Sequence, residues 1–263
     1  MGDQNLWALI LGASSGFGAA SARALAAAGY NIVGVHLDRK ATMPLADAAK
    51  AAIEAEGREA LFFNINAASE EKRSETLDRV AERFSSGKNE LRVLLHSLAF
   101  GTLKPFFPEE GVGLGPRNMD MTLDVMAHSL VYWSQAVVGR GLMKRHGRIF
   151  AMTSAGSQRV WKSYGAVSAA KAALESHIRQ LALELAPLGI SANALRAGVT
   201  DTPALRKIPG HESMVQVAAA RNPAGRLTTP EDVAKSLVVL AHTDLDWLTG
   251  NVLNIDGGEN ICE

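Results

Sequence analysis

Short apolar runs alternate with segments of helical periodicity along the whole chain. The predicted strands cover residues 7–11, 32–37, 60–65, 91–96, 148–153, 191–195 and 252–255. The predicted helices cover residues 17–28, 44–56, 69–84, 123–140, 169–185 and 230–240. Most of the strand segments are continuously apolar, which is typical of a parallel sheet covered by helices on both faces. The pattern predicts the α/β class: a single doubly wound Rossmann-type domain over residues 1–263, with a mostly parallel seven-stranded sheet.

Two segments interrupt this alternation. Residues 101–118 contain three prolines and four glycines, which predicts a long loop after the fourth strand. Residues 201–222 are expected to be partly helical, interrupted by prolines and a glycine. Long insertions at this edge of a doubly wound sheet serve as lids or substrate walls, or form plain surface loops. The apolar residues of 201–222 fit either the wall of an acyl-chain site or a helix packed on the core.

Composition narrows the class of protein. Lys plus Arg and Asp plus Glu both total 27, so the chain has no net charge to attract nucleic acid. No apolar stretch approaches the roughly 20 residues of a membrane span, and the N-terminus does not resemble a signal peptide. The seven histidines are scattered without the spacing of metal ligands. We therefore expect a soluble cytoplasmic protein that binds no membrane, no nucleic acid and no catalytic metal.

A glycine-rich turn follows the first predicted strand and opens an alanine-rich helix. Gly12 permits a tight turn, Gly16 lets backbone approach a phosphate, and Gly18 allows close packing of helix on strand. The helix N-terminus offers unpaired N–H groups and a positive dipole to a pyrophosphate. In this place the pattern predicts dinucleotide binding. The residues of the turn expected to contact the cofactor are Gly12, Ser14, Ser15, Gly16, Phe17 and Gly18.

This GxxxGxG form resembles the short-chain dehydrogenase/reductase family, and the resemblance extends over essentially the whole chain. Asn66-Ala67 is similar to the family's adenine site, and the run 96–99 (His-Ser-Leu-Ala) stands where the family has Asn-Asn-Ala-Gly. Gly198, Thr200 and Thr202 match the Gly-x-x-x-Thr step that faces the nicotinamide carboxamide, and 256–258 matches the C-terminal Asp-Gly-Gly. Further cofactor contacts implied by the resemblance are Asn66, Ala67, Ser97, Leu98, Ala99, Lys171, Gly198, Thr200 and Thr202.

Lys171 lies seven positions after Tyr164, on the same predicted helical face. Seven residues return to nearly the same face about 10.5 Å along a helix axis, against about 6 Å for four residues. Ordinary family members use Tyr-x-x-x-Lys, which puts Val167 at the tyrosine position, and Met126 falls at the position of the family's asparagine. Neither side chain donates a proton, so the ordinary ketone or alcohol site is disfavoured.

These departures resemble the enoyl-acyl-carrier-protein reductase branch, whose motif is Tyr-x6-Lys. The stretch 154–171 looks especially like the Bacillus-type enoyl reductase III, as does the run 222–226. The resemblance implies reduction of an enoyl thioester in fatty acid biosynthesis, the substrate being carried on acyl carrier protein, by a homotetramer. When hydride reaches the β-carbon of an enoyl thioester, charge develops on the thioester oxygen, and a donor must lie within reach of that atom.

The expected catalytic residues are Tyr164, Lys171 and Ser154. Tyr164 would stabilise the enolate, and Lys171 would bind the nicotinamide ribose and lower the pKa of the tyrosine through its charge. Many bacterial enoyl reductases have a second tyrosine ten residues before the catalytic one, where this chain has Ser154. Ser154 either contacts the substrate or hydrogen-bonds the end of its strand.

The choice of cofactor depends on the end of the second strand. Enzymes that use NAD place an acidic residue there to bind the ribose hydroxyls. In this chain the position falls on His36, with Asp38, Arg39 and Lys40 beyond it. Arg39 or Lys40 would pair with a 2′-phosphate, with Ser14 adding a hydrogen bond, which favours NADPH. Asp38 favours NADH if it faces the ribose, and an exposed loop without a cofactor role stays open.

Two other functions stay open at this stage. One is a ketone or alcohol oxidoreductase of the same fold, in which Tyr164 reaches its substrate through a different local geometry. The other is a nucleotide-binding pseudoenzyme, which the missing asparagine and the altered spacing allow. Consumption of NADPH with a crotonyl thioester, with ketones only, or with neither distinguishes the three.

Overall fold

A computed structural model describes residues 5–242 and 245–262 of the chain. It contains a seven-stranded sheet in the order β3-β2-β1-β4-β5-β6-β7, in which every pairing is parallel. The strands are β1 (Asn5–Leu11), β2 (Asn31–His36), β3 (Ala60–Asn64), β4 (Asn89–His96), β5 (Arg148–Thr153), β6 (Ser191–Ala197) and β7 (Val252–Ile255). The predicted fold is confirmed, and the sheet is parallel throughout rather than mostly so.

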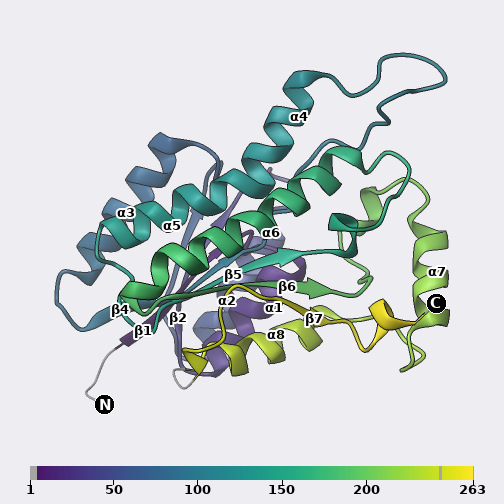
Figure 1. Ribbon diagram of the computed structural model, residues 1–263. Coiled ribbons are helices and arrows are strands. Elements are labelled where there is room, and N and C mark those ends of the chain that lie inside the picture. Colours follow the sequence, from purple (N-terminus) through teal and green to yellow (C-terminus); the bar gives the residue numbers. More distant parts are fainter. Residues whose placement is uncertain (1–4, 243–244, 263) are drawn as a thin grey trace.

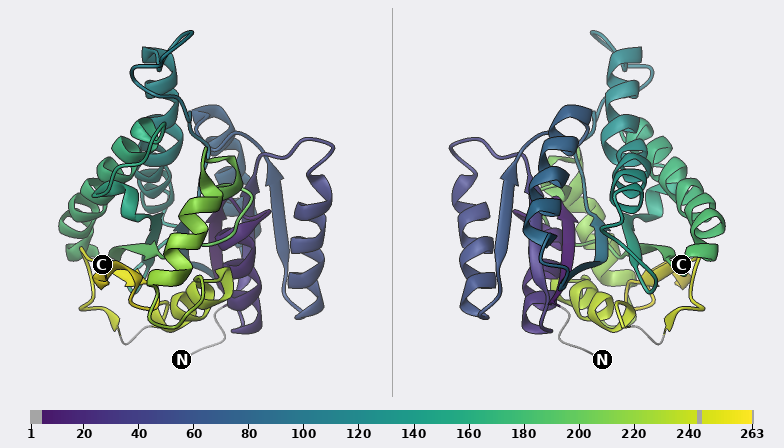
Figure 2. Two further views of the ribbon diagram at one scale, coloured as in Figure 1. Left: turned by 90° about the vertical axis from the view of Figure 1, so that its right-hand side faces the viewer. Right: turned by 90° about the vertical axis from the view of Figure 1, so that its left-hand side faces the viewer.

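Helices cover both faces of the sheet (Figures 1 and 2). One layer holds α1 (Gly16–Ala27), α2 (Met43–Ala55) and α8 (Pro230–Leu240). The other holds α3 (Glu70–Phe84), α5 (Ser129–Gly139) and α6 (Gly165–Leu185). Each layer packs on its own hydrophobic cluster, so both faces of strands such as β1 are buried. This burial explains why the strand segments are continuously apolar in sequence.

The helix predicted at 123–140 begins earlier and is not uniform. α4 (Pro116–Leu123) starts at a proline, which suits the first turn of a helix because its missing N–H needs no partner there. A π-helical turn (Asp124–His128) then joins α4 to α5. The predicted loop at 101–118 is therefore wrong in its last residues, because 116–118 belong to α4. In Figures 1 and 2 the loop and α4 project beyond the rest of the domain.

The carboxyl ends of the strands lie at the right of Figure 1, beside α7 (His211–Arg221). The segment 201–222 is partly helical as expected: a 3₁₀ turn (Leu205–Lys207) precedes α7. The chain switches direction along the sheet between β1 and β4, the neighbouring strands from which the order runs outward on both sides. Ligands of doubly wound sheets bind at such a switch point, beyond the carboxyl ends of the strands.

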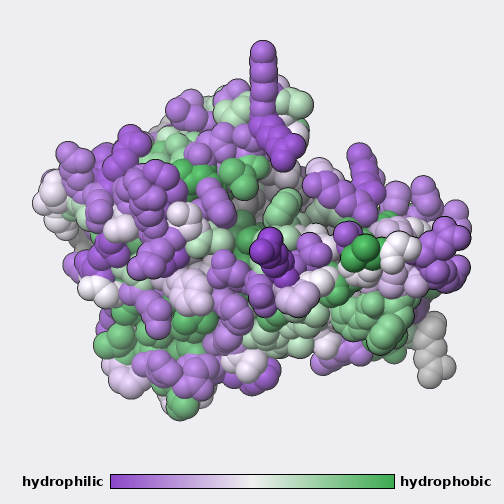
Figure 3. All heavy atoms as spheres, turned by 90° about the horizontal axis from the view of Figure 1, so that it is seen from above, coloured by the Kyte–Doolittle hydropathy of each residue, from purple (hydrophilic) through white to green (hydrophobic). Residues whose placement is uncertain are grey.

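Viewed from above, hydrophilic side chains cover most of one face, with hydrophobic patches between them (Figure 3). None of the helices within residues 5–242 and 245–262 has the length and apolar character needed to cross a membrane.

Candidate active site

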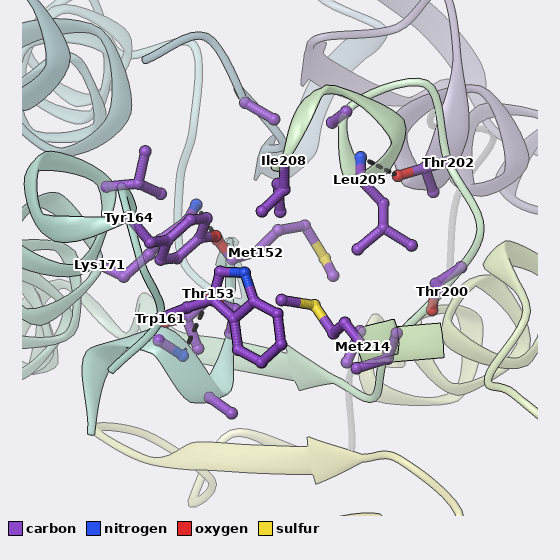
Figure 4. A pocket seen from close by; sticks show the side chains of 18 of the residues that line it. Met152, Thr153, Trp161, Tyr164, Lys171, Thr200, Thr202, Leu205, Ile208 and Met214 are labelled. Carbon is purple, nitrogen blue, oxygen red and sulfur yellow. Dashed lines mark hydrogen bonds between the residues drawn. The ribbon is translucent and has the colours of Figure 1, made fainter. Parts of the chain in front are cut away.

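A largely apolar pocket of about 500 Å³ opens at the carboxyl edge of the sheet (Figure 4). Its walls come from the segments that follow β4, β5 and β6, from the start of α6, and from α7. The sequence-predicted residues that line it are Phe17, Ser97, Leu98, Ala99, Ser154, Tyr164, Lys171, Gly198, Thr200 and Thr202. The predicted catalytic and nicotinamide-side residues therefore meet in one cavity. The other predicted cofactor residues are not part of its lining: Gly12, Ser14, Ser15, Gly16, Gly18, His36, Arg39, Lys40, Asn66 and Ala67.

The glycine turn joins β1 to α1. Two of its glycines have no room for a side chain. Gly12 has φ +93°, and a Cβ there would lie 2.5 Å from the Ser97 carbonyl oxygen. A Cβ at Gly18 would lie 1.9 Å from the carbonyl oxygen of Gly12. At Gly16 the nearest atom to a Cβ would be the Thr202 methyl, at 3.6 Å, so the turn faces the loop after β6.

The first turn of α1 suits an anion. Its N-cap residue, Ser15, makes no side-chain capping bond, and the first turn carries no acidic residue. The N–H groups at a helix start need partners and carry a positive dipole end, so a pyrophosphate fits here. The residues present therefore fit a nicotinamide dinucleotide: the start of α1 would hold its phosphates, and Thr200 and Thr202 would hold its nicotinamide.

Asn66 and Ala67, the predicted adenine contacts, lie beyond the end of β3. The Asn66 side-chain oxygen accepts from the backbone N–H of Ala68, 3.0 Å away. Ala67 is buried, and its carbonyl accepts from the Trp133 indole at 2.8 Å. These bonds fix the backbone of the turn.

The end of β2 presents a carboxylate to the glycine turn. The side chain of Asp38 lies 2.9 Å from the buried imidazole of His36 (Nδ1 to Oδ2), and its backbone pairs with the Asn64 side chain in both directions. Burial alone raises the pKa of Asp38, but hydrogen bonds with Thr42, Ser14 and His36 outweigh it and hold the pKa below its usual value. Asp38 is thus an ionised group beside Ser14. His36 is turned inward, whereas Arg39 and Lys40 are exposed.

Tyr164 is the N-cap residue of α6, so it lies just before the helix rather than within it. Its backbone is not helical (φ −96°, ψ 2°), and Ser163 before it has the left-handed φ of +65°. The expectation that Tyr164 and Lys171 share one continuous helical face is therefore wrong by one residue. The phenol packs against Gly156, where a Cβ would lie 2.6 Å from the Tyr164 ring. Burial raises the pKa of Tyr164, and a hydrogen bond with Ser154 opposes the rise.

Ser154 makes the local bond that its position suggested, and its contact with substrate stays a prediction. Its hydroxyl accepts from the backbone N–H of Gly156 at 3.3 Å, which caps the 3₁₀ turn after β5, and it also hydrogen-bonds Tyr164. The group that favours ionised Tyr164 in this structure is Ser154. The expectation that Lys171 lowers the pKa of the tyrosine is not met, because burial dominates and the pKa is raised.

Lys171 lines the pocket but is buried, with 6% of its surface exposed. Its ammonium group donates to the Met152 carbonyl oxygen at 2.7 Å. Burial lowers the pKa of Lys171 to about 8, and the negative charge of Glu175 opposes this fall. The lysine is thus fixed at the end of β5, on the side of α6 that faces the sheet.

Glu175 belongs to a buried polar network that the sequence analysis did not include. Its carboxylate accepts from the Thr153 hydroxyl at 2.8 Å and from the Arg196 guanidinium at 3.1 Å. Arg196 also donates to the side chains of Gln158 and Ser157, in the loop that follows Ser154. The sequence does indicate that Glu175 lies near Lys171, because a spacing of four positions puts both residues on one helical face. The pairing with Arg196 has no local signal because β6 supplies it.

Val167 and Met126 occupy the places at which the family usually has its tyrosine and asparagine. Both are buried, at 4% and 3% exposure, and both line the pocket. Neighbouring His96 is fully buried, with its Nε2 2.8 Å from the Ser129 hydroxyl. Burial and the positive charge of Lys171 lower the pKa of His96 to about 3, so its imidazole is neutral at physiological pH. Among these side chains none replaces Tyr164 as a proton donor.

Comparison with known proteins identifies the family of the chain. The profile of a family described as Enoyl-(Acyl carrier protein) reductase matches residues 12–260. The chain belongs to the short-chain dehydrogenase/reductase family. It is therefore a nicotinamide-dependent oxidoreductase of that family.

Two curated relatives cover nearly the whole chain. One is a 1-cyclohexenylcarbonyl-CoA reductase from Streptomyces collinus, 31% identical over 98% of this chain and 88% of that protein. The other is a cis-4-hydroxycyclohexanecarboxylate dehydrogenase from Sinomonas cyclohexanicum, 32% identical over 95% of each chain. The curated relatives thus include both a cyclohexenylcarbonyl-CoA reductase and a hydroxycyclohexanecarboxylate dehydrogenase at similar sequence identity.

Solved structures agree in fold. The NADH-dependent enoyl-acyl-carrier-protein reductase of Aquifex aeolicus VF5 superposes with a TM-score of 0.84, at 24% identity over 98% of both chains. A short-chain dehydrogenase from Burkholderia cenocepacia J2315 in complex with NADP has a TM-score of 0.82, at 28% identity over 98% of this chain and 99% of that one. Related structures therefore bind NAD or NADP.

Proposed function

We propose that this protein reduces the 2,3 double bond of an enoyl thioester with a nicotinamide cofactor. The observation that carries the proposal is the placement of one proton donor. Tyr164 and Ser154 present their hydroxyls in an apolar pocket, while Val167 and Met126 fill the places of the ordinary ketone-reductase donor and asparagine. The name of the Streptomyces collinus relative, which describes an unsaturated acyl-CoA reductase, supports the same reaction.

In the proposed reaction, the bound cofactor supplies hydride to the β-carbon of the substrate. Tyr164 hydrogen-bonds the thioester oxygen, on which negative charge develops, and so stabilises the enolate. A proton from solvent then adds at the α-carbon, which completes the addition of hydride and proton across the double bond. Burial keeps the phenol protonated, as a hydrogen-bond donor must be, and Ser154 orients it.

Lys171 acts from beneath the tyrosine. Its bond to the Met152 carbonyl fixes the ammonium group in a dry environment, where a positive charge acts strongly on nearby developing negative charge. In the proposed complex Lys171 would also bind the ribose of the nicotinamide, as the family resemblance implies.

The position of Asp38 supports NADH over the NADPH favoured by the sequence. The carboxylate is ionised and hydrogen-bonded with Ser14 of the glycine turn, where it can accept from ribose hydroxyls. The negative charge of the Asp38 carboxylate would repel a 2′-phosphate at the same place. Arg39 and Lys40 are exposed and stay the candidates for NADPH binding.

The carrier of the acyl group would approach across the pocket mouth. Arg159 and Lys207 line the pocket and are exposed, so they suit the phosphate groups of coenzyme A or of an acyl carrier protein. We propose acyl carrier protein as the carrier, on the resemblance to the enoyl reductases, especially the Bacillus-type enoyl reductase III. The expected homotetramer stays a prediction, which the mass of the particle in solution tests.

A second candidate function is oxidation or reduction of an alcohol or ketone. The hydrogen bond between Ser154 and Tyr164 favours it, because a serine and tyrosine together bind a carbonyl oxygen in ordinary family members. The cyclohexanecarboxylate dehydrogenase relative points the same way.

The test measures loss of reduced-cofactor absorbance with NADH and NADPH, offered crotonyl-CoA, the same acyl group on acyl carrier protein, and a panel of cyclic and linear ketones. Consumption with the enoyl thioesters supports the proposal. Consumption with ketones alone supports the second candidate. Cofactor binding without turnover of any substrate contradicts both.

A further inference from the structure

We propose that Trp161 is the specificity-determining wall of the acyl site and restricts it to short or compact acyl groups. The inference rests on the proposed function, since it concerns the substrate of the same pocket. Trp161 was not among the candidate residues of the sequence analysis.

The indole of Trp161 is fixed to the segment that leads into α7. Its Nε1 donates to the Pro209 carbonyl oxygen at 3.0 Å, across 48 positions of sequence. Pro209 begins the turn into α7, and at the next residue, Gly210, a Cβ would lie 3.6 Å from the indole. The ring thus ties the loop after β5 to the segment that carries the opposite wall.

The same residue is tied to the proton donor. The backbone N–H of Tyr164 donates to the Trp161 carbonyl oxygen at 3.1 Å, which closes a turn with Ser163 in the left-handed conformation. Trp161 is therefore three residues from the catalytic hydroxyl and fixed relative to it. A wall anchored in this way limits the space available to a substrate held by Tyr164.

The indole also faces the apolar part of the cavity. Trp161 lines the pocket together with Leu205, Ile208 and Met214, and in Figure 4 the ring stands between Tyr164 and Met214. The side chain is also partly open to solvent, with 37% of its surface exposed. The pocket of about 500 Å³ must hold the nicotinamide as well as the acyl group, because Thr200 and Thr202 line it too.

These observations lead to a restricted acyl site. The acyl chain must extend from Tyr164 into the apolar part of the pocket, where the indole is the largest rigid side chain. A hydrophobic pocket discriminates by roughly 10- to 200-fold for each methylene that it fits or rejects. Removal of the ring is therefore expected to admit longer chains without touching the reacting atoms.

The experiment compares crotonyl-CoA with trans-2-dodecenoyl-CoA in wild type, Trp161→Ala, Trp161→Phe and Trp247→Ala. Trp247 is the matched control, since 98% of its surface is exposed and it lies outside the pocket lining. In Trp161→Ala we expect the ratio of kcat/KM for dodecenoyl to that for crotonyl to rise at least about tenfold. Trp161→Phe keeps an aromatic wall and should raise the ratio less, and Trp247→Ala should leave it unchanged.

A ratio within about threefold of wild type in Trp161→Ala overturns the inference. If that variant does not fold, as judged by circular dichroism, Trp161→Leu replaces it under the same criterion. Failure of the proposed function has a different signature, because the wild type would then reduce neither thioester. Tryptophan fluorescence provides a second readout: an acyl thioester should quench wild type more than Trp161→Phe, and equal quenching contradicts the wall.

Discussion

Glu175, one helical turn after Lys171 on α6, forms a buried ion pair with Arg196 at a distance of 3.1 Å. The negative charge of Glu175 opposes the fall in the pKa of Lys171 that burial causes, and the Arg196 guanidinium donates a hydrogen bond to the same carboxylate. Buried pairs such as this one contribute little net stability against apolar replacements of similar volume. In this protein the pair places the negative charge of Glu175 close to the catalytic lysine.

The first prediction concerns the pH dependence of the reaction. Because burial lowers the pKa of Lys171 to about 8, the ammonium group is charged below that pH and loses its proton above it. If the charged lysine is required, kcat/KM falls as pH rises through about 8. A profile of kcat/KM against pH, which reports the free enzyme, measures this limb. A rate that stays level to pH 10 would show that the charge is not needed.

The second prediction concerns Glu175. Its negative charge raises the pKa of Lys171, so Glu175→Gln should move the basic limb of the profile to lower pH. Glu184→Gln, at an exposed position of the same helix, is the control and should not move it. Thermal unfolding of both variants checks that they fold, since breaking a buried pair costs about 3–5 kcal/mol. An unshifted limb in folded Glu175→Gln would assign the ion pair a purely structural role.

The third prediction concerns the proton donor. Tyr164→Phe removes the hydroxyl and keeps the ring that packs against Gly156, so we expect kcat to fall at least about 100-fold while cofactor affinity persists. Tyr132→Phe, at an exposed position on α5, should retain wild-type activity. Enzyme assays with fluorescence titration of the cofactor measure both quantities. Near-wild-type turnover in Tyr164→Phe would contradict the assignment of Tyr164 as the proton donor.

The fourth prediction concerns the choice of cofactor. Asp38→Ser removes the ionised carboxylate beside Ser14, so kcat/KM for NADPH relative to NADH should rise about tenfold or more. Wild type should show the lower KM with NADH. Thr42→Val, which removes one hydrogen bond to the same carboxylate, is a milder companion variant. A wild-type preference for NADPH would instead assign the site to Arg39 and Lys40.

The fifth prediction contrasts two helical glycines. Gly18→Ala places a methyl group 1.9 Å from the Gly12 carbonyl oxygen, so α1 must shift and stability should fall by about 3 kcal/mol. Gly139→Ala, at the end of α5, meets nothing within 4 Å and should raise stability by up to about 1 kcal/mol. Denaturant unfolding measures both. Equal effects would show that the glycine turn tolerates side chains.

Local patterns were sufficient for the sheet and for the glycine turn. The strands are buried on both faces, so their apolar runs are visible without knowledge of their neighbours. The π-helical turn at 124–128 had no such signal, because its extra residue is accommodated by packing against α6. The predicted helix at 169–185 likewise starts too late, because α6 begins at Gly165.

The sequence by itself determined the order of the elements, the dinucleotide turn and the absence of a proton donor at Val167. These features depend on residue type and spacing along one stretch of chain. Only the tertiary structure decided that Asp38 meets Ser14, that Arg196 from β6 supports Glu175, and that Trp161 closes against Pro209. Each of these contacts joins residues from different elements, and side chains far apart in sequence reveal their partners only when the sheet brings them together.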